Sequence, residues 1–203
     1  MARIVKLPVS PPKKLGPKKA KRRRKPNLED YGQLNLFAQP PKEGKVVSMH
    51  QQESFFEQAL QLDDEGKPEA EKYYLLAIEN KQREVDAYCN LGIIKSQQED
   101  LAESINYLTK ALELNPRHFE AHYNLANVYS DMGNFPLAKT HYEVSISIDP
   151  DFPDSYYNLG LVLISLKQYE RAIKAINTYI EHSPESDHSV ASELLKTLKS
   201  FAL

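Results

Sequence analysis

The chain has 203 residues, of which 41% are hydrophobic and 27% are charged, a composition typical of one folded domain. Seven glycines and one cysteine leave no material for a glycine-rich phosphate loop, a disulfide framework or a cysteine-based zinc cluster. No apolar run approaches the ~20 residues needed to cross a bilayer, and the N-terminus lacks the apolar core of a secretory signal. We therefore expect a cytoplasmic protein, with a nuclear location as the alternative in a eukaryotic cell.

Charge divides the chain into two parts. Residues 1–50 contain 13 Lys and Arg against 3 Asp and Glu, a net charge of +10, and 7 of the 13 prolines. Residues 51–203 contain 13 Lys and Arg against 25 Asp and Glu, a net charge of −12. A segment with few apolar residues, many prolines and one sign of charge cannot bury enough surface to offset its chain entropy. The sequence predicts a disordered basic tail over 1–50 and an acidic folded body from 51 onward.

The tail contains a dense basic run, since nine of the thirteen residues from Lys13 to Lys25 are Lys or Arg. Its core is Lys18, Lys19, Lys21, Arg22, Arg23, Arg24 and Lys25. Such a run can bind nucleic acid through its phosphates, act as a nuclear import signal, fold back onto the acidic body, or only aid solubility. No aromatic residue interleaves it, so stacking on bases is not expected.

A short apolar motif follows the basic run, formed by Gln33, Leu34, Asn35, Leu36 and Phe37. It is similar to the Q-L-[S/D]-L-F peptide by which bacterial polymerases and repair proteins dock on the replication sliding clamp. The alternative is that these apolar residues pack against the folded body of the same chain. Both interpretations stay open at this point.

The body repeats itself every 34 residues. Pro116, Pro150 and Pro184 share this spacing, and so do Asn90, Asn124 and Asn158, each followed by a leucine and a small residue. Apolar residues at helical spacing predict two amphipathic helices in each unit, with the second helix ending before the proline. An earlier, degenerate unit begins near Phe55. After Pro184, one further amphipathic stripe predicts a single capping helix, formed by Val190, Leu194, Leu195, Leu198 and Phe201.

These columns resemble a known repeat family. Tyr156-x2-Leu159-Gly160, Ala172-x3-Ile176 and Pro184 are similar to the W-x2-L-G-x2-Y, A-x3-F and P pattern of the tetratricopeptide repeat. The resemblance implies an all-α solenoid of helical hairpins over residues 51–184, with three clear repeats and one degenerate first repeat. The capping helix then covers residues 185–203.

The resemblance also implies a concave groove lined by the first helix of each repeat. The candidate peptide-binding residues at these positions are Asp86, Asn90, Glu120, Tyr123, Asn124, Asn127, Asp131, Asp154, Tyr157 and Asn158. None of the groove positions is Lys or Arg. In family members that clamp the carboxylate of a chaperone tail, basic residues stand where this chain has Cys89, Ile93, Asp154 and Asn158. We therefore expect a neutral or basic peptide as the partner.

The asparagine column resembles the asparagine ladder of other members of the family. A carboxamide carries both a donor and an acceptor, so it can pair with the backbone of an extended peptide. Tyr123 and Tyr157 would add stacking area. The alternative is that Asn90, Asn124 and Asn158 bond only within their own repeats.

The chemistry-bearing residues do not form a catalytic pattern. His118, Glu120 and His122 fail the H-E-x-x-H spacing of metalloproteases, and no third ligand lies at a usable distance in the sequence. Cys89 has no histidine in its column to act as a base. The sequence predicts a non-enzymatic adaptor with no cofactor, no metal and no membrane contact. The alternative is a nucleic-acid-associated factor whose tail binds DNA or RNA while the body recruits a protein, and the oligomeric state stays open.

Overall fold

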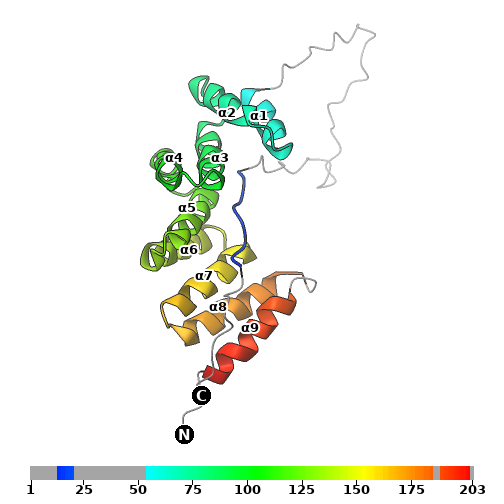
Figure 1. Ribbon diagram of the computed structural model, residues 1–203, viewed down its shortest axis with the longest axis vertical. Helices are drawn as coiled ribbons and strands as arrows, with labels where there is room; N and C mark the ends of the chain where they lie inside the picture. The colour runs from blue at the N-terminus through cyan, green and yellow to red at the C-terminus, as the bar shows by residue number, and fades with distance from the viewer. Residues whose placement is uncertain (1–12, 21–53, 185–187, 202–203) are drawn as a thin grey trace, which may run out of the picture.

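The computed structural model describes residues 13–20, 54–184 and 188–201, and in these ranges it contains nine α-helices and no strand. The helices are α1 (Phe55–Asp64), α2 (Glu69–Glu79), α3 (Glu84–Gln97), α4 (Leu101–Leu114), α5 (Phe119–Asp131), α6 (Phe135–Ile148), α7 (Pro153–Ser165), α8 (Tyr169–His182) and α9 (His188–Phe201). The first eight form four helical hairpins that stack in chain order, with α9 at the end of the stack (Figure 1). The predicted all-α solenoid is confirmed.

The recurring prolines explain where the second helices end. In the last three hairpins that helix ends two residues before a proline, at Leu114, Ile148 and His182. The residue between them is non-helical each time, with ψ of 94° at Asn115, 87° at Asp149 and 158° at Ser183. A proline disfavours the helical region for the residue before it, so each helix stops where the sequence predicts.

The link between the two helices of a hairpin requires one residue with a positive φ. That residue is Glu99, Gly133 or Lys167 in the three clear repeats, with φ of 63°, 73° and 58°. Glycine adopts this conformation without a steric penalty, whereas an L side chain does not. Two of the three links are therefore strained.

Small residues allow the paired helices to approach closely. A Cβ atom added at Gly92 would lie 2.6 Å from Cγ of Leu108, and one added at Gly160 would lie 2.8 Å from Cγ1 of Ile176. Both distances are far below van der Waals contact. In these two hairpins a large side chain of the second helix therefore packs directly against a glycine of the first helix.

The last helix covers the apolar end of the stack. Ala191, Leu194, Leu195 and Leu198 of α9 are buried in the same cluster as Tyr179 of α8. The prediction that Val190 belongs to this stripe is wrong, because its side chain is 53% exposed. In the part of the chain that the structure describes, no helix is both long and apolar enough to span a membrane.

Candidate peptide-binding groove

The three asparagines of the predicted column lie on α3, α5 and α7 and are almost completely buried. What covers them is a segment of the same chain. Residues 13–20, which we call the groove segment, have no regular secondary structure and run alongside the stack from α7 to α3 (Figure 1, blue). The segment therefore runs against the order of the repeats.

Each asparagine pairs with both backbone groups of one residue of the groove segment. Oδ1 of Asn158 accepts from the N–H of Leu15 at 2.6 Å, and its Nδ2 donates to the carbonyl of Leu15 at 2.8 Å. Asn124 makes the same pair with Lys18, at 2.8 Å in both directions. Asn90 makes it with Ala20, at 2.9 and 3.4 Å. We call these three residues the asparagine ladder.

The same asparagines also bond within the scaffold. Nδ2 of Asn90 donates to the hydroxyl of Tyr74 at 3.0 Å, that of Asn124 to Sγ of Cys89 at 3.5 Å, and that of Asn158 to the hydroxyl of Tyr123 at 3.0 Å. Each of these partners belongs to the preceding repeat, so the bonds are not the within-repeat bonds of the alternative interpretation. The scaffold contact orients each carboxamide, and the remaining donor and acceptor meet the backbone of the segment.

The two groove tyrosines are arranged differently, and the hydroxyl of Tyr123 is the one that hydrogen-bonds to the segment. The hydroxyl of Tyr123 lies 3.1 Å from the carbonyl oxygen of Leu15 and 2.8 Å from that of Gly16, to which it donates. Burial raises the pKa of Tyr123, so the group is a neutral donor. Tyr157 is 4% exposed, and its ring packs on that of Tyr179 at 4.9 Å. Its ring belongs to the buried cluster against which Leu15 of the segment packs, so stacking on a partner stays a prediction.

The lysines of the groove segment meet acidic groups of the body at two points. Nζ of Lys14 lies 2.6 Å from the carboxylate of Asp131 and 2.6 Å from the carbonyl oxygen of Asn127. Nζ of Lys19 lies 2.9 Å from Asp63 and 3.3 Å from Asp64. The predicted groove residues thus include Asn127 and Asp131 as contacts of the segment. The pair Asp63 and Asp64 was missed, because it belongs to the degenerate first repeat, where the repeat register gives no position.

Lys18 points to an aromatic ring instead of a carboxylate. Its Nζ lies 5.0 Å from the centroid of the Phe152 ring. This distance suits a cation–π contact. Phe152 precedes α7 and was not among the predicted groove residues.

Three further acidic residues were predicted in the groove, namely Asp86, Glu120 and Asp154. Oδ1 of Asp86 accepts from Nε2 of His118 at 2.9 Å, and Oδ2 accepts from Nε of Arg83 at 2.7 Å. Burial alone would raise the pKa of Asp86, but these two partners lower it below its usual value. Glu120 lies 3.6 Å from Nδ1 of His118. Asp154 lies in the first turn of α7. Asp86 is thus part of a scaffold ion-pair network, and its contact with a ligand stays a prediction.

Histidines and the cysteine serve the scaffold. Nδ1 of His118 accepts from the N–H of Ala121 at 3.2 Å and caps α5. His122 and His141 face each other with their Nδ1 atoms 3.0 Å apart, a pair that the sequence did not signal. Burial raises the pKa of Cys89, which keeps it a thiol. Among the residues that the structure describes, no group of three or more His, Cys, Asp or Glu side chains is placed to hold a metal ion.

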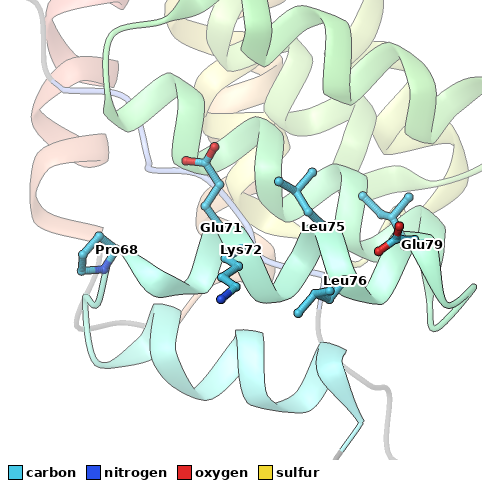
Figure 2. Close-up of a pocket in the computed structure, with 7 residues that line it drawn as sticks. Pro68, Glu71, Lys72, Leu75, Leu76 and Glu79 are labelled. Atoms are coloured by element: carbon cyan, nitrogen blue, oxygen red, sulfur yellow. The ribbon is translucent and has the colours of Figure 1, made fainter.

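A second hollow lies along α2, away from the asparagine ladder. Its volume is about 710 Å³, and it is lined by Pro68, Glu71, Lys72, Leu75, Leu76, Ile78 and Glu79. Figure 2 shows that these side chains are spread along the helix and do not converge on one point. The arrangement offers no focus for a ligand, so the groove is the candidate site.

Residues 21–25 of the basic run and the motif at Gln33, Leu34, Leu36 and Phe37 lie outside the described residues.

Comparisons with known proteins agree with this fold. Two tetratricopeptide repeat family models match residues 83–151 and 141–174. No curated protein matches the sequence. Similar solved structures include a tetratricopeptide repeat protein from Parabacteroides merdae ATCC 43184, with 22% identity, a TM-score of 0.62, and coverage of 73% of this chain and 59% of that one.

Two further structures show the same fold. MamA from Desulfovibrio magneticus RS-1 has 21% identity and a TM-score of 0.58, with coverage of 73% of this chain and 93% of that one. The first TPR of Spaghetti (RPAP3), bound to the HSP90 peptide SRMEEVD, has 19% identity and a TM-score of 0.55, with coverage of 58% and 92%. The two family models and the shared fold of these structures support the assignment of the chain to the tetratricopeptide repeat family.

Proposed function

We propose that the chain is a non-enzymatic adaptor whose concave groove binds an extended, basic segment of a partner protein. One observation carries this proposal: three buried carboxamides each pair with both backbone groups of a residue in an extended segment. The family is generally an interaction repeat, and the similar RPAP3 domain is bound to a peptide. The groove segment occupies the place that a partner would take.

Backbone pairing supplies the affinity in this arrangement. A hydrogen bond contributes ~0.5–1.5 kcal/mol net, so the two bonds of one asparagine contribute about 1–3 kcal/mol. Every peptide has the same backbone groups, so the ladder alone binds extended segments of many sequences. The choice of partner must come from side chains.

Charge favours a basic partner over an acidic one. Asp131 and the pair Asp63 and Asp64 face the lysines of the groove segment. Burial lowers the pKa of Lys14, and its hydrogen bond to Asp131 offsets this only in part. The cost of desolvating these charges opposes their attraction. They therefore contribute more to the choice of ligand than to the affinity for it. The peptide SRMEEVD, which the RPAP3 domain binds, has the opposite charge pattern.

The nucleic-acid alternative stays a prediction. In the described part of the basic run, Lys14, Lys18 and Lys19 are already engaged by carboxylates and an aromatic ring of the body. A nucleic acid would have to use the lysines and arginines of residues 21–25 or displace the groove segment. The sliding-clamp interpretation of residues 33–37 is likewise a prediction.

Binding of a synthetic peptide tests the proposal. The test uses a full-length variant with the substitutions Leu15→Pro, Lys18→Pro and Ala20→Pro. These substitutions remove the three N–H groups that donate to the ladder, so the groove segment is released, and we call this protein the released variant. A labelled peptide with the sequence of residues 13–20 is then titrated by fluorescence anisotropy, with circular dichroism as the check on the fold. We expect the peptide to bind this released variant more tightly than the unmodified chain.

Two controls isolate the ladder. N-methylation of the peptide at Lys18 removes an N–H that Asn124 accepts, and binding should fall. N-methylation at Lys19, whose N–H is not one of the three, should have a smaller effect. If the released variant is folded and the unmethylated peptide does not bind, the groove is not a peptide site.

A further inference from the structure

We propose that the groove also reads side chains, and that the partner segment has a basic residue, then an apolar one, three residues of which the last is not proline, a second basic residue and a small residue. The groove segment displays this pattern as Lys14, Leu15, Gly16 to Lys18, Lys19 and Ala20. The inference rests on the proposed function and specifies its partner. The partner segment runs from α7 toward α3 and competes with the chain's own residues 13–20.

Side-chain burial divides the groove segment into two kinds of position. We call a position read where the folded body covers its side chain, and unread where the side chain is exposed. Lys14, Leu15 and Lys19 are half-buried and Ala20 is buried, whereas Lys13 and the stretch 16–18 are exposed. The read positions thus form two pairs at the ends of the segment. Between them the chain is held by the backbone of Lys18, which pairs with Asn124, and the exposed Lys18 side chain lies over the ring of Phe152.

The ladder contacts are unevenly spaced along the segment, and side chains together with Pro17 must set its register. Asn158, Asn124 and Asn90 pair with residues 15, 18 and 20, so the contacts are separated by three residues and then by two. A shift that placed Pro17 opposite Asn124 would lose the N–H that Asn124 accepts, because proline has none. Pro17 falls between two contacts, where no N–H is needed, so its lack of a donor costs no ladder bond.

The position of Ala20 is closed to larger side chains. Ala20 is 1% exposed and belongs to the buried cluster that contains Cys89 and Val128. At Gly16, by contrast, an added Cβ would meet no heavy atom within 4 Å. The chain therefore offers a matched pair, one position where added volume must be rejected and one where it is tolerated.

The two read lysines lie at the C-terminal ends of helices. Lys14 contacts the carboxylate of Asp131, the last residue of α5, and Lys19 contacts the carboxylates of Asp63 and Asp64, the last residues of α1. A cation is favoured there because the negative end of the helix dipole adds to the carboxylate charge. Both ends of the pattern are thus electrostatically selected.

Single substitutions in the labelled peptide 13–20, titrated against the released full-length variant, test the pattern. We expect Ala20→Leu to weaken binding about 5- to 150-fold through overpacking, and Gly16→Ala to leave it within about twofold because that position is open. Lys19→Met should weaken binding roughly three- to fivefold. Lys13→Met removes the same charge at an exposed position and should have less effect.

The outcomes separate this inference from the function on which it rests. If the parent peptide does not bind the folded variant, the groove function itself fails. If the parent binds, but Ala20→Leu binds like Gly16→Ala and Lys19→Met binds like Lys13→Met, the pattern is overturned and the groove reads the backbone alone. A peptide with the sequence in reverse order must also bind more weakly than the parent, since equal binding would contradict the direction.

Discussion

Substitution of the central ladder residue, Asn124→Ala, should release the middle of the groove segment while the stack stays folded. Asn124 makes two hydrogen bonds of 2.8 Å to the backbone of Lys18. At ~0.5–1.5 kcal/mol net for each bond, the loss is about 1–3 kcal/mol, which corresponds to roughly 5- to 150-fold less protection of the Lys18 amide. Amide hydrogen exchange measured by NMR reports this directly. Leu15 and Ala20 should change less, because their own asparagines remain.

A matched control separates the loss of a contact from a general loss of stability. Asn106 is an exposed asparagine on α4, so Asn106→Ala makes the same chemical change away from the groove. Exchange of the helix amides in both variants checks that the stack is intact. If the Lys18 amide exchanges at the same rate in Asn124→Ala and Asn106→Ala, or already exchanges at the unfolded-chain rate in the unmodified protein, the ladder does not hold the segment.

Three further predictions concern the stack, and all are read from urea unfolding. Gly160→Ala places a Cβ 2.8 Å from Cγ1 of Ile176 and should lower the free energy of unfolding by about 1–3 kcal/mol; an unchanged value would contradict the close approach of the helices. Lys167→Gly removes the strain of a φ of 58° and should raise that free energy by about 0.5–1 kcal/mol, so a decrease would show that the side chain matters more than the backbone. Burial, with the neighbouring histidine, lowers the pKa of His141 to about 4, so between pH 6.5 and 4 the unfolded chain binds a proton that the folded chain does not. Stability should therefore fall by about 1 kcal/mol from pH 7 to pH 5, after allowance for solvent screening, and His141→Phe should flatten this dependence.

The repeat architecture could be predicted because its causes are local and recur. Close helix pairing needs a small residue such as Gly160 opposite a large one such as Ile176, and a proline such as Pro184 ends the second helix. Each constraint leaves a residue type at a fixed position every 34 residues. The last helix, α9, has no counterpart in the repeats, so only its own apolar pattern predicts which residues are buried. That pattern included Val190, which is exposed.

The occupant of the groove could be predicted only as one alternative among several. The ladder pairs with backbone N–H and carbonyl groups, which every residue has, so no side-chain motif in residues 13–20 announces the contact. The opposite charges of tail and body pointed in the right direction but fixed no register. The composition of the tail indicates only that it cannot form a core by itself, and the groove segment is ordered by donors and acceptors that the repeats supply.

The repeat positions carry no information on the neighbours of individual groove residues. Tyr157 occupies the same column as Tyr123, and its ring packs on that of Tyr179. Asp86 occupies a groove position, but Arg83 and His118 engage its carboxylate. A repeat alignment gives the direction of a side chain, whereas its partners depend on residues outside the repeated columns.

The central claim is that three asparagine side chains hold the backbone of residues 13–20, and NMR couplings across those hydrogen bonds test it most directly. In a deuterated, uniformly ¹⁵N- and ¹³C-labelled sample of the full-length chain, long-range HNCO spectra should connect the amide nitrogens of Leu15, Lys18 and Ala20 with the side-chain carbonyl carbons of Asn158, Asn124 and Asn90, respectively. The absence of these three correlations, together with unfolded-chain chemical shifts for the same amides, would contradict the account.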